Sequence, residues 1–246
     1  MDILIFFIFG IVIGSFLNVV ILRVPKKESI AFPASHCPTC KTPLKWWHNI
    51  PIFSYIALKG KCAFCKEKIS IQYPIIELIS GFIVASVYYK TGEFNIFSLM
   101  LTLSFLSLLV SSIVDLKYKA ITYIMNVLPV TFAIFSSPNI LENFTNALLF
   151  AGGAVFIRDY ISAMINKEAM GDGDILVFAT MGAILGVKFA LMAIFLGAIF
   201  AIFPSIYNRL AKKDLELPFI PFLSLGLFVV WFFHFQFLRI WEFLYA

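Results

Sequence analysis

The chain has 246 residues, of which 61% are apolar and only 13% are charged, and its mean hydropathy is +0.94. Soluble domains carry about 25% charged residues, so this composition is too apolar for a surface in water. It excludes a disordered chain, a collagen-like chain and a secreted disulfide scaffold, and it predicts a polytopic membrane protein. A cleavable signal peptide is not expected, because Asp2 stands where such a peptide is basic and the apolar run after it is full length.

Uncharged stretches long enough for membrane helices divide almost the whole chain. A spanning helix needs about 20 mostly apolar residues. Eight stretches reach or approach this length, although Glu77 interrupts the second and the fifth and sixth are short: 3–22, 69–89, 94–114, 120–141, 143–157, 175–187, 189–208 and 217–238. The sequence therefore predicts an all-α polytopic membrane protein with about eight transmembrane helices.

The basic residues predict the direction in which these helices cross. With the N-terminus placed outside, sixteen of the nineteen Lys and Arg residues fall on the inner side, and the other three are Lys90, Lys188 and Arg239. Cytoplasmic loops of membrane proteins carry such an excess of positive charge. We attribute the net charge of +5 to this topology, and no nucleic-acid partner is expected.

The one long polar segment is expected to form a small cytoplasmic unit between the first and second helices. The predicted organisation is a first transmembrane helix at 1–22, an insertion at 23–70 and a membrane-embedded domain at 71–246. So small a unit rarely stabilises itself without a disulfide or a metal.

All four cysteines of the chain lie in this insertion, as two Cys-x-x-Cys motifs separated by twenty-one residues: Cys37, Cys40, Cys62 and Cys65. Each motif lets two thiolates reach one tetrahedral ion, and two motifs complete a four-sulfur site. Cytoplasmic thiols stay reduced, which argues against disulfides. The motifs therefore predict a structural Zn²⁺ site without an open position for substrate. Unliganded or regulatory thiols are the alternative, and His36 is left out of the expected ligand set.

Few carboxylates lie in or beside the predicted helices, and such groups mark functional sites by default because burying them is costly. Asp115 ends the third predicted helix, and Asp174 closes the turn 171–174 before the sixth, at the same membrane face. Two adjacent carboxylates share a proton, so that one activates water and the other stabilises the oxyanion formed at a peptide carbonyl. The pair indicates an aspartic peptidase, with glycines giving the turn its backbone freedom.

Charge placement alone leaves simpler interpretations open. Asp115 could be a juxtamembrane charge and the turn 171–174 a flexible loop, while Asp172 is expected to be solvated rather than catalytic. Glu77 is better explained as a hydrogen-bond or ion-pair partner between its helix and the insertion. For the whole chain, the rivals are a membrane scaffold or adaptor with a partner-binding zinc unit, and an ion-coupled transporter, whose carboxylates usually lie nearer the bilayer midplane.

Five ordered stretches, spread nearly from end to end, resemble the signatures of one family. They are Gly14-Ser15-Phe16-Leu17-Asn18-Val19-Val20 with Arg23 and Pro25; Ser35-His36-Cys37, Asn49-Ile50-Pro51 and Gly60-Lys61-Cys62 of the insertion; Tyr73-Pro74 with Glu77-Leu78; Glu168-Ala169-Met170-Gly171-Asp172-Gly173-Asp174; and Leu217-Pro218-Phe219-Ile220-Pro221-Phe222. The chain thereby resembles the type IV prepilin peptidases, which are GxGD-type aspartic proteases with N-methyltransferase activity.

This resemblance implies that Asp115 and Asp174 are the catalytic pair. It implies that the substrates are prepilins and pseudopilins of type IV pili and type II secretion, and that their basic leaders are cleaved at the cytoplasmic face of the bacterial inner membrane. It also implies methylation of the new N-terminus with S-adenosylmethionine, for which the residues themselves show no cofactor motif. Ile220 stands where the family usually has glycine, a difference that bears on the shape of the substrate groove.

Overall fold

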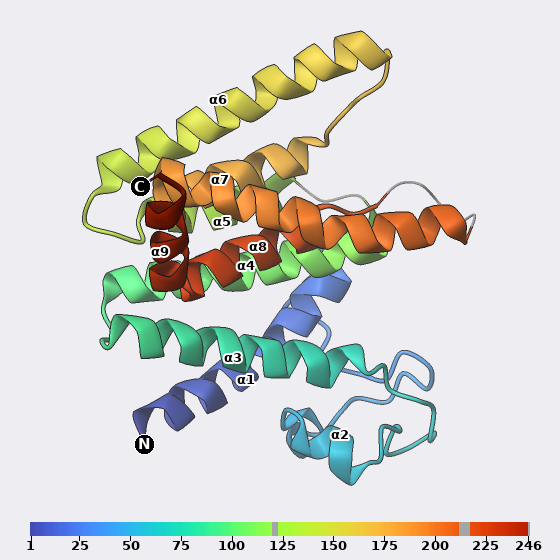
Figure 1. Cartoon of the computed structure of the whole chain (residues 1–246). Helices are drawn as coiled ribbons and strands as arrows, with labels where there is room; N and C mark the ends of the chain where they lie inside the picture. The colour runs from blue at the N-terminus through green and yellow to red at the C-terminus, as the bar shows by residue number, and fades with distance from the viewer. Residues whose placement is uncertain (120–122, 212–216, 246) are drawn as a thin grey trace. The chain divides into compact units, whose positions relative to one another are not determined.

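The computed structural model describes residues 1–119, 123–211 and 217–245, and it is helical throughout except for loops and two isolated β-bridges. The predicted all-α fold is therefore confirmed for the described residues (Figure 1). The chain divides into two compact units, Met1–Glu93 and Phe94–Ala246. The boundary lies just after the second long helix, which ends at Thr91. This helix therefore belongs to the same unit as the first helix and the segment between them.

Unit 1 consists of two long helices and the polar segment that joins them. The long helices are α1 (Asp2–Arg23) and α3 (Gln72–Thr91). The segment between them contains three short elements: η1 (Val24–Lys26), η2 (Trp46–Asn49) and α2 (Phe53–Ala57).

Small residues allow α1 and α3 to pack at very short range. A Cβ atom on Gly14 would lie 2.7 Å from the Glu77 Cα, and one on Gly10 would lie 2.7 Å from the Ser80 carbonyl oxygen. Glycines four residues apart permit such close approach between membrane helices. The buried Asn18 adds a polar contact between them, because its Nδ2 donates to the Tyr73 carbonyl oxygen at 3.2 Å. A side chain at position 10 or 14 would push the helices apart.

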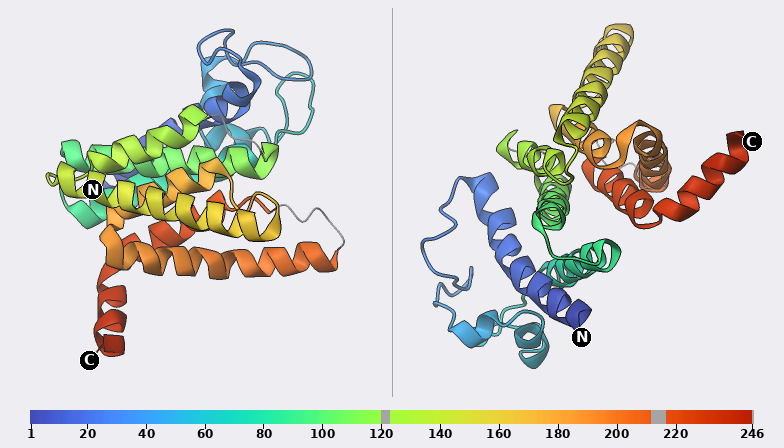
Figure 2. Two further views of the ribbon diagram at one scale, coloured as in Figure 1. Left: turned by 90° about the horizontal axis from the view of Figure 1, so that it is seen from above. Right: turned by 90° about the vertical axis from the view of Figure 1, so that its left-hand side faces the viewer.

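Unit 2 is a helical bundle in which α4 and α7 make most of the inter-helix contacts. Its α4 packs on α5 and α8, and its α7 packs on α5, α6 and α8 (Figures 1 and 2). The elements in chain order are α4 (Ile96–Tyr118), α5 (Tyr123–Ile134), α6 (Ile140–Ile165), α7 (Asp172–Leu210), α8 (Ile220–Phe232) and α9 (His234–Tyr245).

Serines on α4 donate hydrogen bonds to backbone carbonyl groups of α5, one of which its proline leaves without a partner. Pro129 lies inside α5 and has no N–H to donate to the carbonyl group of Met125, four residues earlier. The Ser111 hydroxyl donates to that oxygen at 3.0 Å, and the Ser104 hydroxyl donates to the Pro129 carbonyl oxygen at 2.8 Å. In an apolar surrounding, an unpaired carbonyl is costly, so these bonds fix α5 against α4.

The 39-residue α7 is a helical hairpin rather than one straight helix. Gly186 has φ 67° and ψ 176°, which interrupts the helix. Figure 1 shows α7 reversing direction between its two halves. A straight helix of this length would extend about 58 Å, roughly twice the thickness of the bilayer hydrocarbon. The two halves correspond to the separate stretches 175–187 and 189–208 of the sequence analysis.

Length and hydropathy alone qualify four helices of the described residues as membrane spans, or five if α8 and α9 count as one broken span. The number of eight crossings stays a prediction. Instead of one helix across 217–238, the chain bends by 83° between α8 and α9 (Figure 2). Polar residues return from His234 onward, so the chain after α8 is less suited to continue through lipid.

The reversal at Gly186 predicts a selective effect of alanine. Its backbone conformation is nearly exclusive to glycine, so Gly186→Ala should cost about 1–3 kcal/mol, although the nearest atom to an added Cβ is 3.8 Å away. Gly152→Ala is the control, because Gly152 lies inside α6 with nothing within 4 Å of an added Cβ. Thermal unfolding in detergent should show a lower midpoint for Gly186→Ala only. Equal midpoints would contradict the hairpin.

Candidate functional site

The two aspartates singled out in the sequence lie together where helix ends of unit 2 meet. Asp115 lies in the last turn of α4, and Asp174 lies in the first turn of α7. Their half-buried carboxyl groups are close enough to interact electrostatically. The first N–H group of α8 also reaches this point, because Ile220 N–H donates to Asp115 Oδ2 at 3.3 Å. The site is thus assembled from three helix termini.

Gly173 permits this convergence because it has no side chain. A Cβ atom there would lie 2.7 Å from Asn126 Nδ2 of α5 and 3.2 Å from Ile220 Cδ1 of α8. The expected reason for the glycines, backbone freedom in the turn, is wrong. Gly171 has φ −73° and ψ 152°, which any residue adopts, and Gly173 is inside the helix. Close packing is therefore the physical reason for Gly173.

Two contributors to the site were missed in the sequence. Asn126 is only 3% exposed, and within the described part of the chain its Oδ1 has no hydrogen-bond partner. A polar residue inside the apolar stretch 120–141 was the available signal, because a buried amide normally finds partners. The contribution of Ile220 is a backbone N–H group, so its side-chain identity carried no signal.

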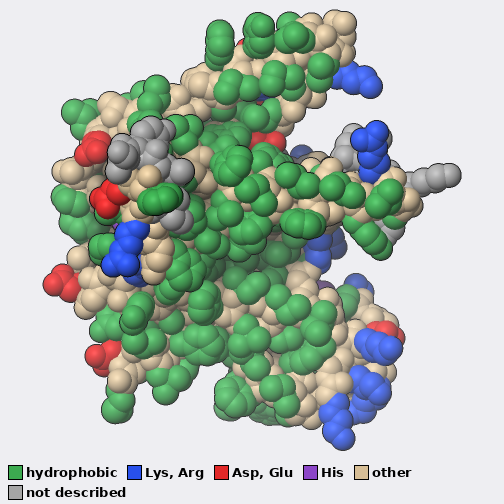
Figure 3. All heavy atoms as spheres, in the orientation of Figure 1, with side chains coloured by type: hydrophobic (Ala, Val, Ile, Leu, Met, Phe, Trp, Pro, Cys, Tyr) green, Lys and Arg blue, Asp and Glu red, His purple; other side chains and the backbone are tan. Residues whose placement is uncertain are grey.

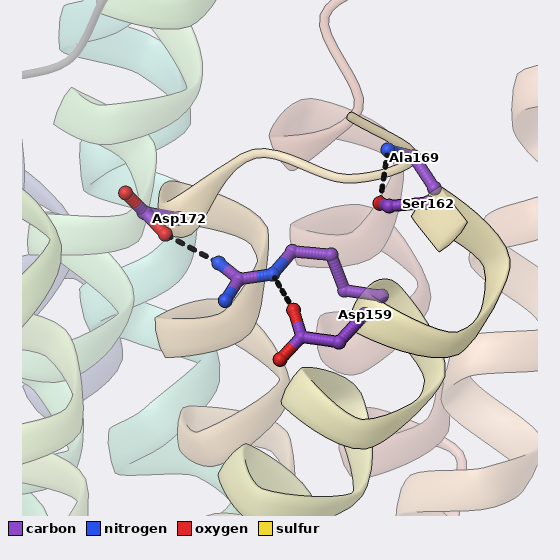
Figure 4. Close-up of polar contacts among 5 residues, drawn as sticks. Asp159, Ser162, Ala169 and Asp172 are labelled. Atoms are coloured by element: carbon purple, nitrogen blue, oxygen red, sulfur yellow. Dashed lines mark hydrogen bonds and ion pairs between the residues drawn. The ribbon is translucent and has the colours of Figure 1, made fainter. Parts of the chain in front are cut away.

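Asp172 is exposed and contacts Arg158, the basic residue of α6 (Figure 4). Arg158 Nη1 lies 2.6 Å from Asp172 Oδ1, and Arg158 Nε lies 2.9 Å from Asp159 Oδ1. The Asp172 side chain is 85% exposed, in accordance with the expectation that it is solvated. Together with the bond from the Ala169 N–H to Ser162 Oγ at 3.0 Å, these contacts hold the beginning of α7 to the end of α6.

The four cysteines of the insertion form a second candidate site. Their Sγ atoms all lie within 4.8 Å of one another, and Cys37 Sγ is 3.8 Å from Cys65 Sγ. Thiolates bound at 2.3 Å to one tetrahedral Zn²⁺ would be about 3.8 Å apart. The arrangement therefore fits a single ion with four sulfur ligands, as predicted, and the described cysteines form no disulfide.

Both motifs fold into the same local turn. The N–H groups of Lys41 and Lys66 donate to the carbonyl oxygens of Cys37 and Cys62 at 2.9 and 3.1 Å, and both lysines have positive φ. Hydrogen bonds from the hydroxyl and N–H of Thr42 lower the pKa of Cys40 to about 6. This shift favours the thiolate of Cys40, which is the form that binds a metal ion.

Glu77 connects the insertion to α3. Its carboxylate is only 5% exposed, and Oε2 accepts a hydrogen bond from the Ile52 N–H at 2.8 Å. Ile52 precedes α2 and has φ 60°, an uncommon value for a β-branched residue. Glu77 is therefore a hydrogen-bond partner between its helix and the insertion, which is the interpretation preferred from the sequence.

Fold and site together define a multi-pass membrane protein with paired aspartates and a cysteine cluster. Residues 8–91 match the Bacterial Peptidase A24 N-terminal domain, and residues 101–206 match the Type IV leader peptidase family. The chain belongs to this family.

Several relatives match along almost their whole length. The "Type 4 prepilin-like proteins leader peptide-processing enzyme" of Escherichia coli is 31% identical, with 88% of each chain covered. The "Prepilin leader peptidase/N-methyltransferase" of Bacillus subtilis is 33% identical, with 90% of each chain covered. The protein of the same name from Vibrio cholerae is 30% identical over 93% of this chain and 96% of its own. No solved structure matches the chain.

The packing at Gly173 predicts a coupled pair of substitutions. Gly173→Ala should destabilise the protein by about 1–3 kcal/mol, because the added methyl group overpacks the contact with Asn126. Gly171→Ala is the matched control, since its nearest neighbour, Asp174 Oδ2, would be 3.7 Å away.

Adding Asn126→Ala to Gly173→Ala should recover part of the lost stability, because it removes the group that the methyl meets. Thermal unfolding of the wild type, of Gly173→Ala and Asn126→Ala alone, and of the double variant measures this coupling. Strictly additive effects would show that the two residues do not contact each other.

Proposed function

We propose that this protein is an aspartic endopeptidase that removes the basic leader of prepilins and pseudopilins, and that it methylates the new N-terminus. The observation that carries the peptidase proposal is the meeting of Asp115 and Asp174 beside the first N–H group of α8. Membership of a leader peptidase family and the names of relatives support the same reaction. The chain is thus an enzyme of the membrane, with prepilin-like proteins as substrates.

Paired carboxyl groups can carry out this hydrolysis without a covalent intermediate. One carboxylate takes a proton from water while the water oxygen bonds to the peptide carbonyl carbon, and the protonated partner gives its proton to the carbonyl oxygen. Proton transfer to the amide nitrogen then releases the new amine and the carboxylate of the leader. The Ile220 N–H group orients the Asp115 carboxylate, and the positive end of α8 stabilises negative charge there.

The active site is proposed to lie on the cytoplasmic side of a bacterial inner membrane, with eight crossings and the N-terminus outside. Sixteen of nineteen Lys and Arg residues on the inner side support this orientation. The reversal at Gly186 supports counting α7 as two crossings. On this topology the insertion and the aspartates face the cytoplasm, where the basic leader also lies.

Zn²⁺ is the proposed ion of the cysteine cluster, and its role is structural. Cys37, Cys40, Cys62 and Cys65 would hold it, and four thiolates leave no position for substrate. When bound, the ion stabilises the folded insertion against the unfolded chain.

The methyl donor is proposed to be S-adenosylmethionine, and the name N-methyltransferase of the relatives supports a methyl-transfer activity. Its site is not of the Rossmann type in the described residues, where strand pairing is limited to two isolated bridges. The insertion is the part of the chain that we associate with this second activity.

The catalytic assignment predicts which aspartates are essential. Asp115→Asn and Asp174→Asn should each lower the rate of prepilin cleavage by about 1,000-fold or more, because each removes a group that transfers a proton. Asp172→Asn is the control within the same turn, and it should retain substantial activity because its side chain is exposed and paired with Arg158. Cleavage by purified enzyme in detergent measures all three. An active Asp174→Asn variant with an inactive Asp172→Asn variant would refute the assignment.

The metal assignment predicts one Zn²⁺ per chain in elemental analysis of the purified protein. Replacing Cys37 and Cys40 by Ser should remove the metal and unfold the insertion, because two ligands cannot hold the ion. We expect methylation to be lost first, with cleavage reduced but measurable, since the aspartates lie on helices outside the insertion. Wild-type protein that is fully active without metal would contradict a structural zinc site.

A further inference from the structure

The insertion exposes large apolar side chains on two neighbouring short elements. Phe53 and Ile56 of α2 are 75% and 66% exposed, and Trp46 of the adjacent η2 is 75% exposed. Scattered apolar residues are ordinary on soluble surfaces, but several large ones on adjoining elements indicate a binding surface. We call these three residues the apolar tip.

A hydrogen bond between Ile52, just before α2, and Glu77 of α3 determines how far along α3 the apolar tip lies. Glu77 lies five residues after the first residue of α3, Gln72, which is about 7.5 Å along a helix axis. Since Ile52 N–H bonds to Glu77 Oε2 at 2.8 Å, the residue just before α2 lies at this same level. The insertion therefore folds back along α3 instead of extending away from it.

If α3 crosses the bilayer, the level of the apolar tip along α3 sets the depth of the tip in the membrane. The crossing of α3 belongs to the topology of the proposed function, and the inference rests on it. A position about 7.5 Å inside the helix falls where interfacial apolar side chains are buried, about 5–10 Å into the boundary between headgroups and acyl chains. Phe53 follows Ile52 directly. An exposed phenylalanine at that depth meets lipid rather than water.

The charge of the insertion fits the same surface. Nine Lys and Arg residues lie between Arg23 and Lys68, against only two acidic residues, Glu28 and Glu67. Figure 3 shows basic side chains gathered over this part of unit 1. At the beginning of η2, Lys45 Nζ lies 5.0 Å from the centre of the Trp47 ring, so aromatic and basic groups adjoin. Anionic headgroups attract such clusters, and aromatic rings favour the interface.

We propose that the apolar tip is a lipid-binding surface: Phe53, Ile56 and Trp46 enter the headgroup boundary of the adjacent leaflet, and the surrounding lysines contact anionic headgroups. The zinc-binding unit is thereby held at the bilayer surface. Its position there places it where the cytoplasmic end of a membrane-anchored substrate emerges.

Photocrosslinking in nanodiscs tests this placement with the full-length protein. Phe53 is replaced by p-benzoylphenylalanine, the nanodiscs contain about 30% phosphatidylglycerol in phosphatidylcholine, and mass spectrometry identifies the adduct on the irradiated peptide. Tyr55 is the matched control on the same helix, because it faces the insertion, where its hydroxyl donates to the Ile69 carbonyl oxygen at 3.5 Å. Leu78, exposed beside Glu77 on α3, is the control for depth.

We expect lipid adducts at positions 53 and 78 and protein adducts at position 55. In pure phosphatidylcholine the yield at position 53 should fall several-fold, while the yield at position 78 should not change. Protein adducts or no lipid adduct at position 53, with lipid at 78, would overturn the proposal and leave the topology intact. An equal yield at 53 in both lipids would overturn the role of the lysines.

Absence of lipid at position 78 would instead refute the crossing of α3 and with it the placement of the tip. Cleavage of a prepilin by the same nanodisc samples is measured separately, so failure of the proposed peptidase activity can be distinguished from failure of lipid binding.

Discussion

The close contact at Gly173 is the constraint on which the arrangement of the aspartates depends. Because this residue has no side chain, α5 and α8 approach the first turn of α7 through Asn126 and Ile220. The same approach brings the first N–H group of α8 to Asp115. Helix termini carry unpaired backbone groups that must be satisfied in an apolar surrounding, and here a carboxylate does so. The approach of α5 and α8 to α7, and with it the hydrogen bond to Asp115, therefore depends on one small residue.

Unit 1 follows the same principle with a different carboxylate. Glu77 is buried between helices that approach at Gly14, and it is satisfied by the Ile52 N–H of the insertion. Burying a carboxylate is costly unless it accepts hydrogen bonds, so this bond holds the insertion to α3. Each unit thus uses one intramembrane or juxtamembrane carboxylate to fix a segment that is distant in sequence.

Much of this could be predicted from the sequence because the signals are strong and local. Charge-free stretches located the long helices, and the spacing of Cys37, Cys40, Cys62 and Cys65 located the cluster. The topology placed Asp115 and Asp174 at the same membrane face, and the resemblance to the type IV prepilin peptidases implied that they form a pair. Other features depend on packing that no local pattern reports.

The reason for Gly173 lies in neighbours more than forty residues away along the chain. The N–H group of Ile220 belongs to the backbone and leaves no trace in residue type. Helix α6 continues through Arg158, whose charge is paired with Asp159 and Asp172, and the bend after α8 comes where polar residues return to the chain.

Inhibition by a transition-state analogue tests the central claim, that the two aspartates act together on a tetrahedral carbon, most directly. A prepilin peptide with a hydroxyethylene group in place of the scissile amide should inhibit wild-type enzyme about 100-fold or more strongly than the unmodified peptide binds. Equal affinity of the two peptides would contradict the account.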